Sequence, residues 1–465
     1  MATNEKPSLT QELVRAFTSI HYDSLPPEVV AAVKVATLDT LSALLAGTAS
    51  GTSKKVVALV KDWGGRPEST IFGEDVKVPA ANAVLANSTM ARVYELDAVL
   101  EMLPFHANAI MIPLSLALAE HAGGLSGRDF IVSVAAGIDL AARLGLASKT
   151  TALARSPGAR SMWGTLSGAA TAARIMGLGE EKTFNALGLA YRLGGGGSVL
   201  GGHSLDESTW LGWGIDAMGG ILAASFARQG LTGAEEAVDE YYLRYEGGEY
   251  DRDALLGELG KRFAVTQASL KAWASCRACQ ASIEGTLEMV SHDQLKPEDV
   301  AEITVTLNEI SYRVGCLPLD QKKNPRTSLD ALFSVPFTVG VALAKGRVTI
   351  DSFAWENLND PVILGISNKV LSRMNPDIKY PSGRPAALVE ILMKDGTKYT
   401  RQVDYIKGHP VKKPLTHAEL LDKFKDCASQ AKKPLSHTKI ESIVSFIDRL
   451  EDAEDVTWLM RQASA

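Results

Sequence analysis

The N-terminal half of this chain is patterned almost entirely as helices, and this constrains the fold more than any other feature. From Thr10 to about Leu259, runs with helical periodicity follow one another, such as EVVAAVKVATLDTLSALLAG and GLSGRDFIVSVAAGIDLAARLGLA. These runs are rich in alanine and glycine, which let helix backbones approach closely. The sequence therefore predicts a dense bundle of helices over this region.

The pattern changes after Leu259, where strands alternate with helices. AEITVTLNEI alternates as a strand does, and AALVEILMKDGTKYTRQV is typical of a hairpin that turns at Asp395–Gly396. RVTIDSF is interpreted as a further strand or strand edge, and ASIEGTLEMVSHDQ and SLDALFSVPFTVGVALAKG as helices. We predict a compact α+β unit over about residues 264–405.

The C-terminal tail is predicted to be helical again. Thr416-x-x-Glu419 and Thr438-x-x-Glu441 both have the spacing of a capping box, and an apolar-periodic run follows each.

Composition narrows the class of protein. With 465 residues the chain is long enough for two domains, and its net charge of −6 with no basic stripe argues against nucleic acid as a partner. Four cysteines do not make a disulfide framework, so a reducing compartment is expected. MATNEKPSLTQELV lacks the features of a signal peptide, and no apolar run was judged to reach transmembrane length. We expect a cytoplasmic protein without a membrane partner.

An acidic cluster stands inside an otherwise apolar stretch, YELDAVLEMLPFHANAIMIPL. Glu95, Asp97, Glu101 and His106 all fall there, and Pro104 predicts an irregular connection between two helices. A buried carboxylate is costly unless it is paired or used in function. We interpret Asp97 and His106 as catalytic candidates and Glu95 as a substrate-binding candidate. The alternative is that His106 only satisfies a loop.

A second group of candidates lies in Lys271-Ala-Trp-Ala-Ser-Cys-Arg-Ala-Cys-Gln280. Lys271 and Arg277 stand near the expected domain junction, and a guanidinium suits bidentate binding of a carboxylate. The pair indicates a cleft for a small carboxylate substrate, although a surface salt bridge is the alternative. Cys276 and Cys279 lack further ligands at zinc spacing, so we interpret them as buried thiols and predict no metal site.

Two further stretches are polar or glycine-rich. Arg326 and Ser328 precede a predicted helix whose N-terminal amides could receive an anion, so both are substrate-binding candidates. The glycine run 194–197 lacks the lysine and hydroxyl residue of a P-loop, so we interpret it as a close-packed turn.

Taken together, these motifs resemble the MmgE/PrpD family. The acidic cluster before His106, the following I-P-x-x-x-A-L-A-E helix, and Lys271, Trp273, Cys276 and Arg277 carry the resemblance. It implies a mainly α fold, with a helical domain (residues 1–263), an inserted α+β lid (264–405) and C-terminal helices that return to the helical domain (406–465). It also implies catalysis without a metal or organic cofactor, and a homodimer.

The chain departs from the family pattern at positions expected to be functional. Ala98 replaces the second of two adjacent aspartates, and Phe337 stands where a tyrosine is common. Gly158, followed by Ala159 and Arg160, aligns with a functional histidine, and Thr209 aligns with a lysine. His203, which we count as a substrate-binding candidate, lies just upstream with Asp206 and Glu207. We therefore expect a less positive and more apolar site than is usual for the family.

Three functions stay open from the sequence. The first is a lyase, either a dehydratase or a decarboxylase, that removes a proton alpha to a carboxylate of a small acid other than 2-methylcitrate or cis-aconitate. The second is an isomerase or epimerase that uses the same proton abstraction. The third is a non-catalytic member that binds a ligand or partner. One fold hosts several chemistries, so the sequence does not separate the first two.

Overall fold

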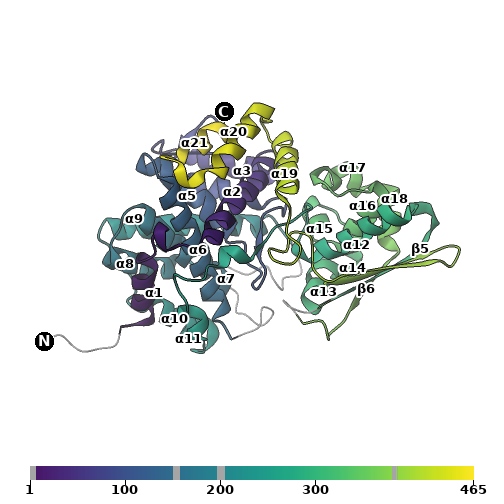
Figure 1. Cartoon of the computed structure of the whole chain (residues 1–465), viewed down its shortest axis with the longest axis horizontal. Coiled ribbons are helices and arrows are strands. Elements are labelled where there is room, and N and C mark those ends of the chain that lie inside the picture. The colour runs from purple at the N-terminus through teal and green to yellow at the C-terminus, as the bar shows by residue number, and fades with distance from the viewer. Residues whose placement is uncertain (1–6, 150–157, 196–204, 380–383, 385, 465) are drawn as a thin grey trace.

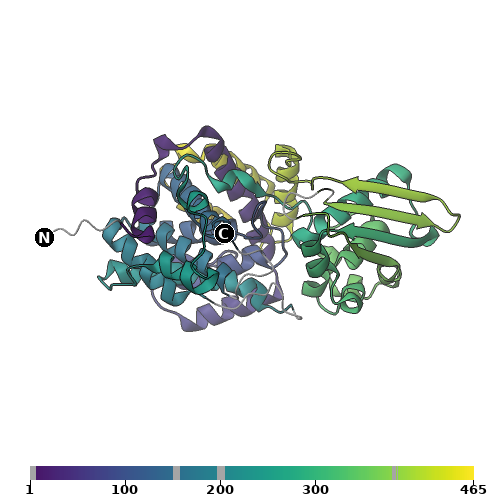
Figure 2. The same ribbon diagram turned by 90° about the horizontal axis from the view of Figure 1, so that it is seen from below.

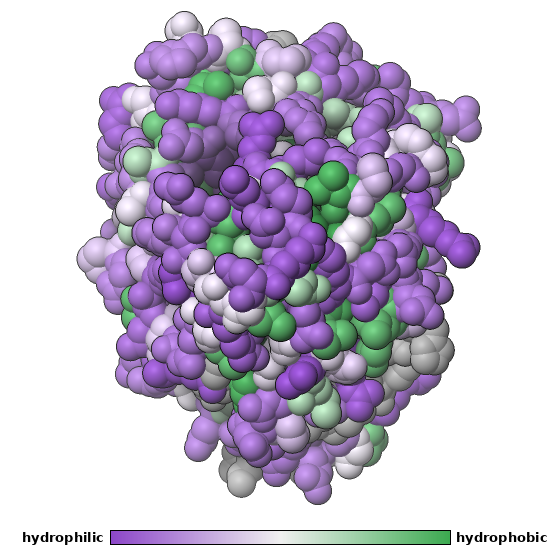
Figure 3. Space-filling view, turned by 90° about the vertical axis from the view of Figure 1, so that its right-hand side faces the viewer, coloured by the Kyte–Doolittle hydropathy of each residue, from purple (hydrophilic) through white to green (hydrophobic). Residues whose placement is uncertain are grey.

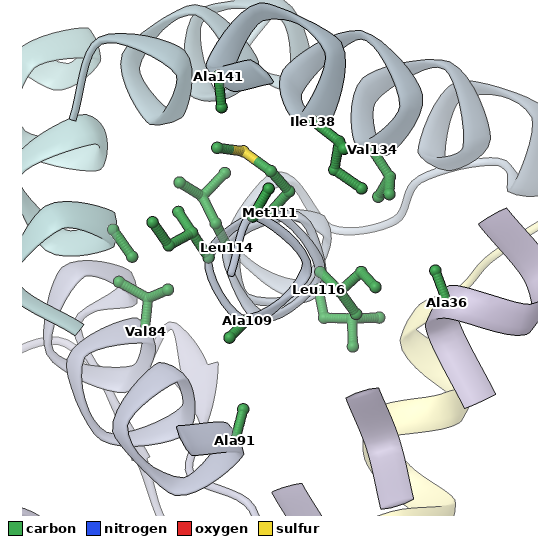
Figure 4. Close-up of a cluster of buried hydrophobic side chains, with 14 of the residues drawn as sticks. Ala36, Val84, Ala91, Ala109, Met111, Leu114, Leu116, Val134, Ile138 and Ala141 are labelled. Atoms are coloured by element: carbon green, nitrogen blue, oxygen red, sulfur yellow. The ribbon is translucent and has the colours of Figure 1, made fainter. Parts of the chain in front are cut away.

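Helix α5 (Asn108–Ala122) is the central element of the larger domain. Its residues from Asn108 to Ala119 are all buried, and a helix that is apolar on every side must be surrounded by other elements. Figure 4 looks along α5 and shows Met111, Leu114 and Leu116 pointing outward among the surrounding helices. Those neighbours include α2 (Pro27–Gly47), α4 (Ala80–Arg92) and α6 (Gly127–Leu146), and α7 (Ala159–Ile175) and α9 (Ser208–Arg228) also pack on α5.

This computed structural model describes residues 7–149, 158–195, 205–379, 384 and 386–464. The mainly α fold class expected from the sequence is confirmed. The other elements of the larger domain are α1 (Leu9–Thr18), η1 (Tyr22–Ser24), α3 (Gly51–Trp63), β1 (Ser69–Thr70), β2 (Lys77–Val78), β3 (Val99–Leu100), α8 (Glu180–Leu193), α10 (Ala237–Glu246), α11 (Arg252–Leu256), η2 (Ala264–Gln267) and β4 (Ala268–Ser269).

The smaller domain is built on a four-stranded mixed sheet in the order β6-β5-β7-β8. Strands β5 and β6 are parallel, whereas β5–β7 and β7–β8 are antiparallel. Helix α12 packs on β7 and β8, and α16 packs on α12 and β6. The elements are α12 (Arg277–Asp293), η3 (Pro297–Asp299), β5 (Val300–Leu307), α13 (Glu309–Cys316), α14 (Leu319–Lys323), α15 (Ser328–Leu332), α16 (Val335–Lys345), η4 (Ile350–Phe353), α17 (Trp355–Leu358), α18 (Pro361–Asn368), β6 (Val370–Met374), β7 (Ala387–Met393) and β8 (Lys398–Val403).

The strand predictions for this domain are confirmed with one exception. The predicted strand AEITVTLNEI overlaps β5 up to Leu307, and its last three residues cap and begin α13. Strands β7 and β8 form the hairpin around Asp395 and Gly396, where Gly396 has a φ of +90°. The interpretation of RVTIDSF as a strand is wrong. Thr349 and Ser352 form a reciprocal capping box there, and this starts the short helix η4 instead. The remaining strand, β6, was not predicted.

The C-terminal helices pack against the larger domain. Helix α19 (His417–Ser429) lies on α2 at the junction of the two domains, which stand side by side in Figures 1 and 2. The capping box at Thr416 and Glu419 is confirmed. The one at Thr438 is wrong, because α20 (His437–Asp448) is capped by Ser436. The tail ends with η5 (Leu450–Asp452) and α21 (Thr457–Ser464).

The outer end of the smaller domain is mainly hydrophilic, with separate hydrophobic patches (Figure 3). Trp355 and Val362 are among the exposed apolar side chains of the smaller domain. The predicted homodimer stays a prediction.

Helix α2 is long and apolar enough to span a membrane by length and composition, contrary to what the sequence suggested. Most of its apolar stretch is buried inside the larger domain, as in the core helix of a soluble protein. Asp39, in the same helix, is fully buried and ion-paired. The helix is therefore weak evidence for a membrane segment.

Helices α7 and α9 approach so closely that their glycines are required. A Cβ atom added to Gly220 on α9 would lie 2.6 Å from the carbonyl carbon of Gly168 on α7. A Cβ added to Gly214 would lie 2.4 Å from the carbonyl oxygen of Leu85 on α4. The contact between Gly168 and Gly220 holds the middle parts of α7 and α9 against each other.

We predict that Gly220→Ala lowers the free energy of unfolding by about 1–3 kcal/mol, because the added methyl group forces the two backbones apart. Gly212→Ala on the same helix is the matched control, since nothing lies within 4 Å of its added Cβ. That variant should be more stable by about 0.5–1 kcal/mol, because alanine favours helix. Urea denaturation measures the free energy of unfolding of both variants. Equal effects of the two substitutions would contradict the close contact at Gly220.

Candidate active site

A short strand pair brings the two sequence motifs together. Strand β3 pairs with β4 in antiparallel register, Val99 opposite Ser269 and Leu100 opposite Ala268. The Glu101 amide also donates to the Gln267 carbonyl at 2.9 Å. The loop with the acidic cluster is therefore fixed against the segment that carries Lys271.

The acidic residues form a buried ionic cluster with two cations. Arg92 donates to Glu95 Oε1 at 2.5 Å and to Asp97 Oδ1. Lys271 Nζ lies 3.0 Å from Glu95 Oε2 and 4.0 Å from Asp97 Oδ1. These four side chains are at most 3 % exposed. Two cations face two carboxylates, so the cluster is neutral.

The cluster controls the charge of its carboxylates. Burial alone would raise the pKa of Glu95 and Asp97, but Arg92 and Lys271 outweigh it and hold both pKa values below their usual range. Glu95 has a φ of +52°, a conformation that a non-glycine residue adopts only when its surroundings fix it. Both carboxylates are therefore ionised and fixed in place at neutral pH.

His106 is oriented by this cluster through one ring nitrogen. Its Nδ1 lies 2.8 Å from Asp97 Oδ2 and 3.1 Å from the Ala98 carbonyl oxygen. Because both partners are acceptors, Nδ1 carries the proton and donates it, and the contact of Arg92 with Nδ1 at 3.0 Å is then not a hydrogen bond. Nε2 makes no hydrogen bond to any other described residue and is the basic nitrogen.

The surroundings keep His106 neutral. Burial and the positive charges of Arg92 and Lys271 lower the pKa of the imidazole to about 4, against the opposing effect of Asp97. An imidazole that is neutral, with an unprotonated Nε2, can accept a proton at neutral pH.

A second group of side chains surrounds the indole ring of Trp213 on α9. The guanidinium carbons of Arg92 and Arg160 lie 5.1 and 5.0 Å from the centre of its indole ring. The His106 ring stands edge-on at 5.1 Å, and Phe105 lies at 5.0 Å. The site therefore has an aromatic wall, and it also holds a cation in Arg160.

Asp216 lies one helical turn beyond Trp213. It accepts a hydrogen bond from Ser161 Oγ, and burial raises the pKa of its carboxyl group to about 7. A Cβ added to Gly164 on α7 would lie 3.0 Å from its side chain, so the glycine makes room for it. Asp216 is therefore only partly ionised at neutral pH.

Lys423 connects the C-terminal tail to the site. From α19 its Nζ donates to Asp39 at 2.6 Å, to the Leu96 carbonyl at 2.7 Å and to the Lys271 carbonyl at 2.9 Å. It therefore holds α2, the acidic loop and the Lys271 segment together.

The structure brings some of the predicted site residues together and leaves others apart. Glu95, Asp97, His106 and Lys271 form one cluster. Arg277 is paired across the domain junction with Glu101 at 2.8 Å. His203 lies outside the described residues. Their roles stay predictions.

Arg326 and Ser328 have no contact with the cluster among the described residues. Arg326 is exposed, and the Ser328 hydroxyl donates to the Phe353 carbonyl at 2.7 Å within the smaller domain. Helix α15, which Ser328 begins, has only five residues. Their assignment to substrate binding has no support from this arrangement.

Sequence reasoning did not identify the roles of five residues. They come from four helices that are distant in sequence, and only Arg160 carried a signal, since it follows Gly158 where the family pattern has a histidine. The five are Arg92, Arg160, Trp213, Asp216 and Lys423.

The described residues offer no candidate site for a metal ion or a reactive thiol. They contain no group of three or more His, Cys, Asp or Glu side chains arranged for a metal ion. Cys276 and Cys279 are buried free thiols, as predicted, and burial raises their pKa. A surface groove of about 520 Å³ lies between α20 and α21, but it lacks a buried charge cluster, so we place the active site at the junction instead.

Fold and site together define a two-domain enzyme with an oriented, neutral histidine near the domain junction. Residues 11–247 match the MmgE/PrpD N-terminal domain and residues 273–449 match the MmgE/PrpD C-terminal domain. The chain belongs to the MmgE/PrpD family, which confirms the resemblance.

Individual relatives are distant but match over nearly the whole chain. Human cis-aconitate decarboxylase is 26 % identical over 97 % of this chain and 94 % of that protein. Cis-aconitate decarboxylase of Aspergillus terreus is 22 % identical over 98 % of this chain and 97 % of that protein. The mitochondrial 2-methylcitrate dehydratase of Yarrowia lipolytica is 27 % identical, but only over 29 % of this chain and 28 % of that protein. These names support a lyase of the MmgE/PrpD type.

We predict that Glu95→Gln lowers the free energy of unfolding by about 3–5 kcal/mol, because it leaves Lys271 buried without its close partner. The control is Glu101→Gln, which breaks the more exposed pair with Arg277 and should cost about 1 kcal/mol or less. Urea denaturation measures both. Equal losses would show that the inner cluster is no more tightly coupled than the outer pair.

Proposed function

We propose that this chain is a cofactor-independent lyase that transfers a proton at the carbon alpha to a carboxylate of a small carboxylic acid. His106 Nε2 is the base, and the observation that supports this role is the hydrogen bonding of Nδ1 to Asp97 and to the Ala98 carbonyl. We further propose a cytoplasmic homodimer, as the sequence suggested.

In a dehydration, the first step breaks the alpha C–H bond and moves its proton to Nε2. The electron pair spreads onto the neighbouring carboxylate and then forms a carbon–carbon double bond as the beta C–O bond breaks. The departing oxygen takes the proton from Nε2 and leaves as water, which returns His106 to its neutral form. The negative charge that develops on the reacting carboxylate is stabilised by the positive charge of Arg92, which lies over Trp213 beside His106.

In a decarboxylation, the C–CO₂ bond breaks first and its electron pair stays on carbon. That carbon then takes a proton that reaches it from solvent through Nε2, and His106 is protonated only during this transfer, because its resting form is neutral. The names of the near-full-length relatives make decarboxylation the first reaction to assay. The neutral state of His106 fits the proton abstraction of the dehydration directly.

Lys271 has a supporting role in this arrangement. It is fully buried and pairs with Glu95, so it acts on the reaction through the two carboxylates that hold Arg92 and His106. The replacement of the family's histidine and lysine by Gly158 and Thr209 supports a substrate other than 2-methylcitrate.

We predict that Asp97→Asn and His106→Gln each lower kcat by about 10²–10⁴-fold, the contribution of a positioned general base. For the wild type, kcat/KM should rise through about pH 4 and stay flat from about pH 6 to 8, because His106 must be neutral to accept a proton. A profile that still rises near pH 7 would contradict the neutral histidine.

The reaction type is tested by incubating the enzyme in D₂O with a panel of di- and tricarboxylates. Loss of CO₂ or water with a new ultraviolet absorbance marks a lyase. Deuterium uptake without net loss marks an isomerase and overturns the lyase assignment. His106→Gln is the control, and a lyase activity that survives in it would remove His106 from the mechanism.

A further inference from the structure

Nearly all of the charged side chains around His106 are ion-paired with a side chain of opposite charge. In the inner cluster Arg92 and Lys271 are balanced by Glu95 and Asp97. Further out, Lys423 is paired with Asp39 and Arg277 with Glu101. An anionic substrate that approaches Nε2 therefore needs a cation that is not already neutralised.

Arg160 is such a cation. It makes no hydrogen bond or ion pair with another described residue, and its guanidinium lies on the Trp213 ring at 5.0 Å. The carboxylate that interacts with it, Asp216, already accepts a hydrogen bond from Ser161. Burial lowers the pKa of Arg160 to about 10, so it is charged at neutral pH.

Arg160 and His106 are also the parts of this site that remain accessible. The His106 side chain is 11 % exposed and Arg160 is partly buried, whereas Lys271 and Asp97 are fully buried. Both lie about 5 Å from the same indole ring, so at most about 10 Å separates the guanidinium from the imidazole. A small acid with two or more carboxylates spans this distance.

The cation–π contact with Trp213 favours this role of Arg160. The guanidinium makes no hydrogen bond to another described residue, so its N–H groups are available to bind a carboxylate in bidentate geometry. The contact also restricts the side chain before the ligand arrives, so less conformational freedom is lost on binding.

We propose that Arg160 binds the non-reacting carboxylate of a di- or tricarboxylate substrate and thereby sets substrate specificity. This rests on the proposed function, because it takes His106 as the group that faces the reacting carbon. It also bears on the expectation of a less positive site, because Arg160 adds a positive charge that the comparison at Gly158 and Thr209 did not count.

The test measures binding, which does not depend on turnover. Calorimetric titration compares succinate with succinamate, in which one carboxylate is replaced by a neutral amide, and tricarballylate serves as the tricarboxylate probe. In the wild type, succinate or tricarballylate should bind at least about 10-fold more tightly than succinamate. Arg160→Gln should weaken dicarboxylate binding by about 10- to 100-fold, as expected for a lost charge-assisted contact, and bring the ratio close to one.

Arg160→Lys and Arg174→Gln are the controls. Lysine keeps the positive charge but lacks the planar, forked N–H groups of a guanidinium. The Arg160→Lys variant should therefore retain part of the preference for dicarboxylates. Arg174 lies on the same helix, where it donates to the Ile20 carbonyl at 2.9 Å, so its loss should affect stability and leave the ratio unchanged.

The outcomes separate this proposal from the proposed function. An unchanged ratio in Arg160→Gln, or no preference for the dicarboxylates in the wild type, overturns the role of Arg160 even if the enzyme turns over a substrate. An Arg160-dependent preference in a protein that shows neither elimination nor deuterium exchange supports the binding role and removes the proposed function.

Discussion

The burial of Arg92 between Glu95 and Asp97 is the interaction on which the active site depends. Three ionised groups inside an apolar bundle are tolerable only if each is paired in fixed geometry. Lys271 completes the balance, and the β3–β4 pair fixes its segment against the acidic loop. Asp97 then has one oxygen left for His106, so the geometry that neutralises the cluster also orients the imidazole.

The helical packing explains why this cluster can be so well enclosed. Helix α5 is buried all round, and His106 lies just before its first residue. Close contact between α7 and α9 through Gly168 and Gly220 keeps those two helices beside each other, with Arg160 near the start of one and Trp213 near the start of the other. Lys423 adds the tail to this arrangement.

Sequence reasoning reached the part of the site that local patterns describe. Glu95, Asp97 and His106 fall within one short segment, and Lys271 lies in a motif shared with the family, so all four could be found. Arg160, Trp213 and Asp216 meet only through helix packing, which periodicity does not reveal. The error at RVTIDSF has a local cause, because a capping box outweighed its β-branched residues.

The central claim concerns a single imidazole, and nitrogen-15 NMR of histidine-labelled protein tests it most directly. With His106→Gln used to assign the signal, the account predicts a neutral ring at pH 7, protonated at Nδ1 and unprotonated at Nε2. An imidazolium at this pH, or a proton on Nε2, would contradict the assignment of His106 as the base.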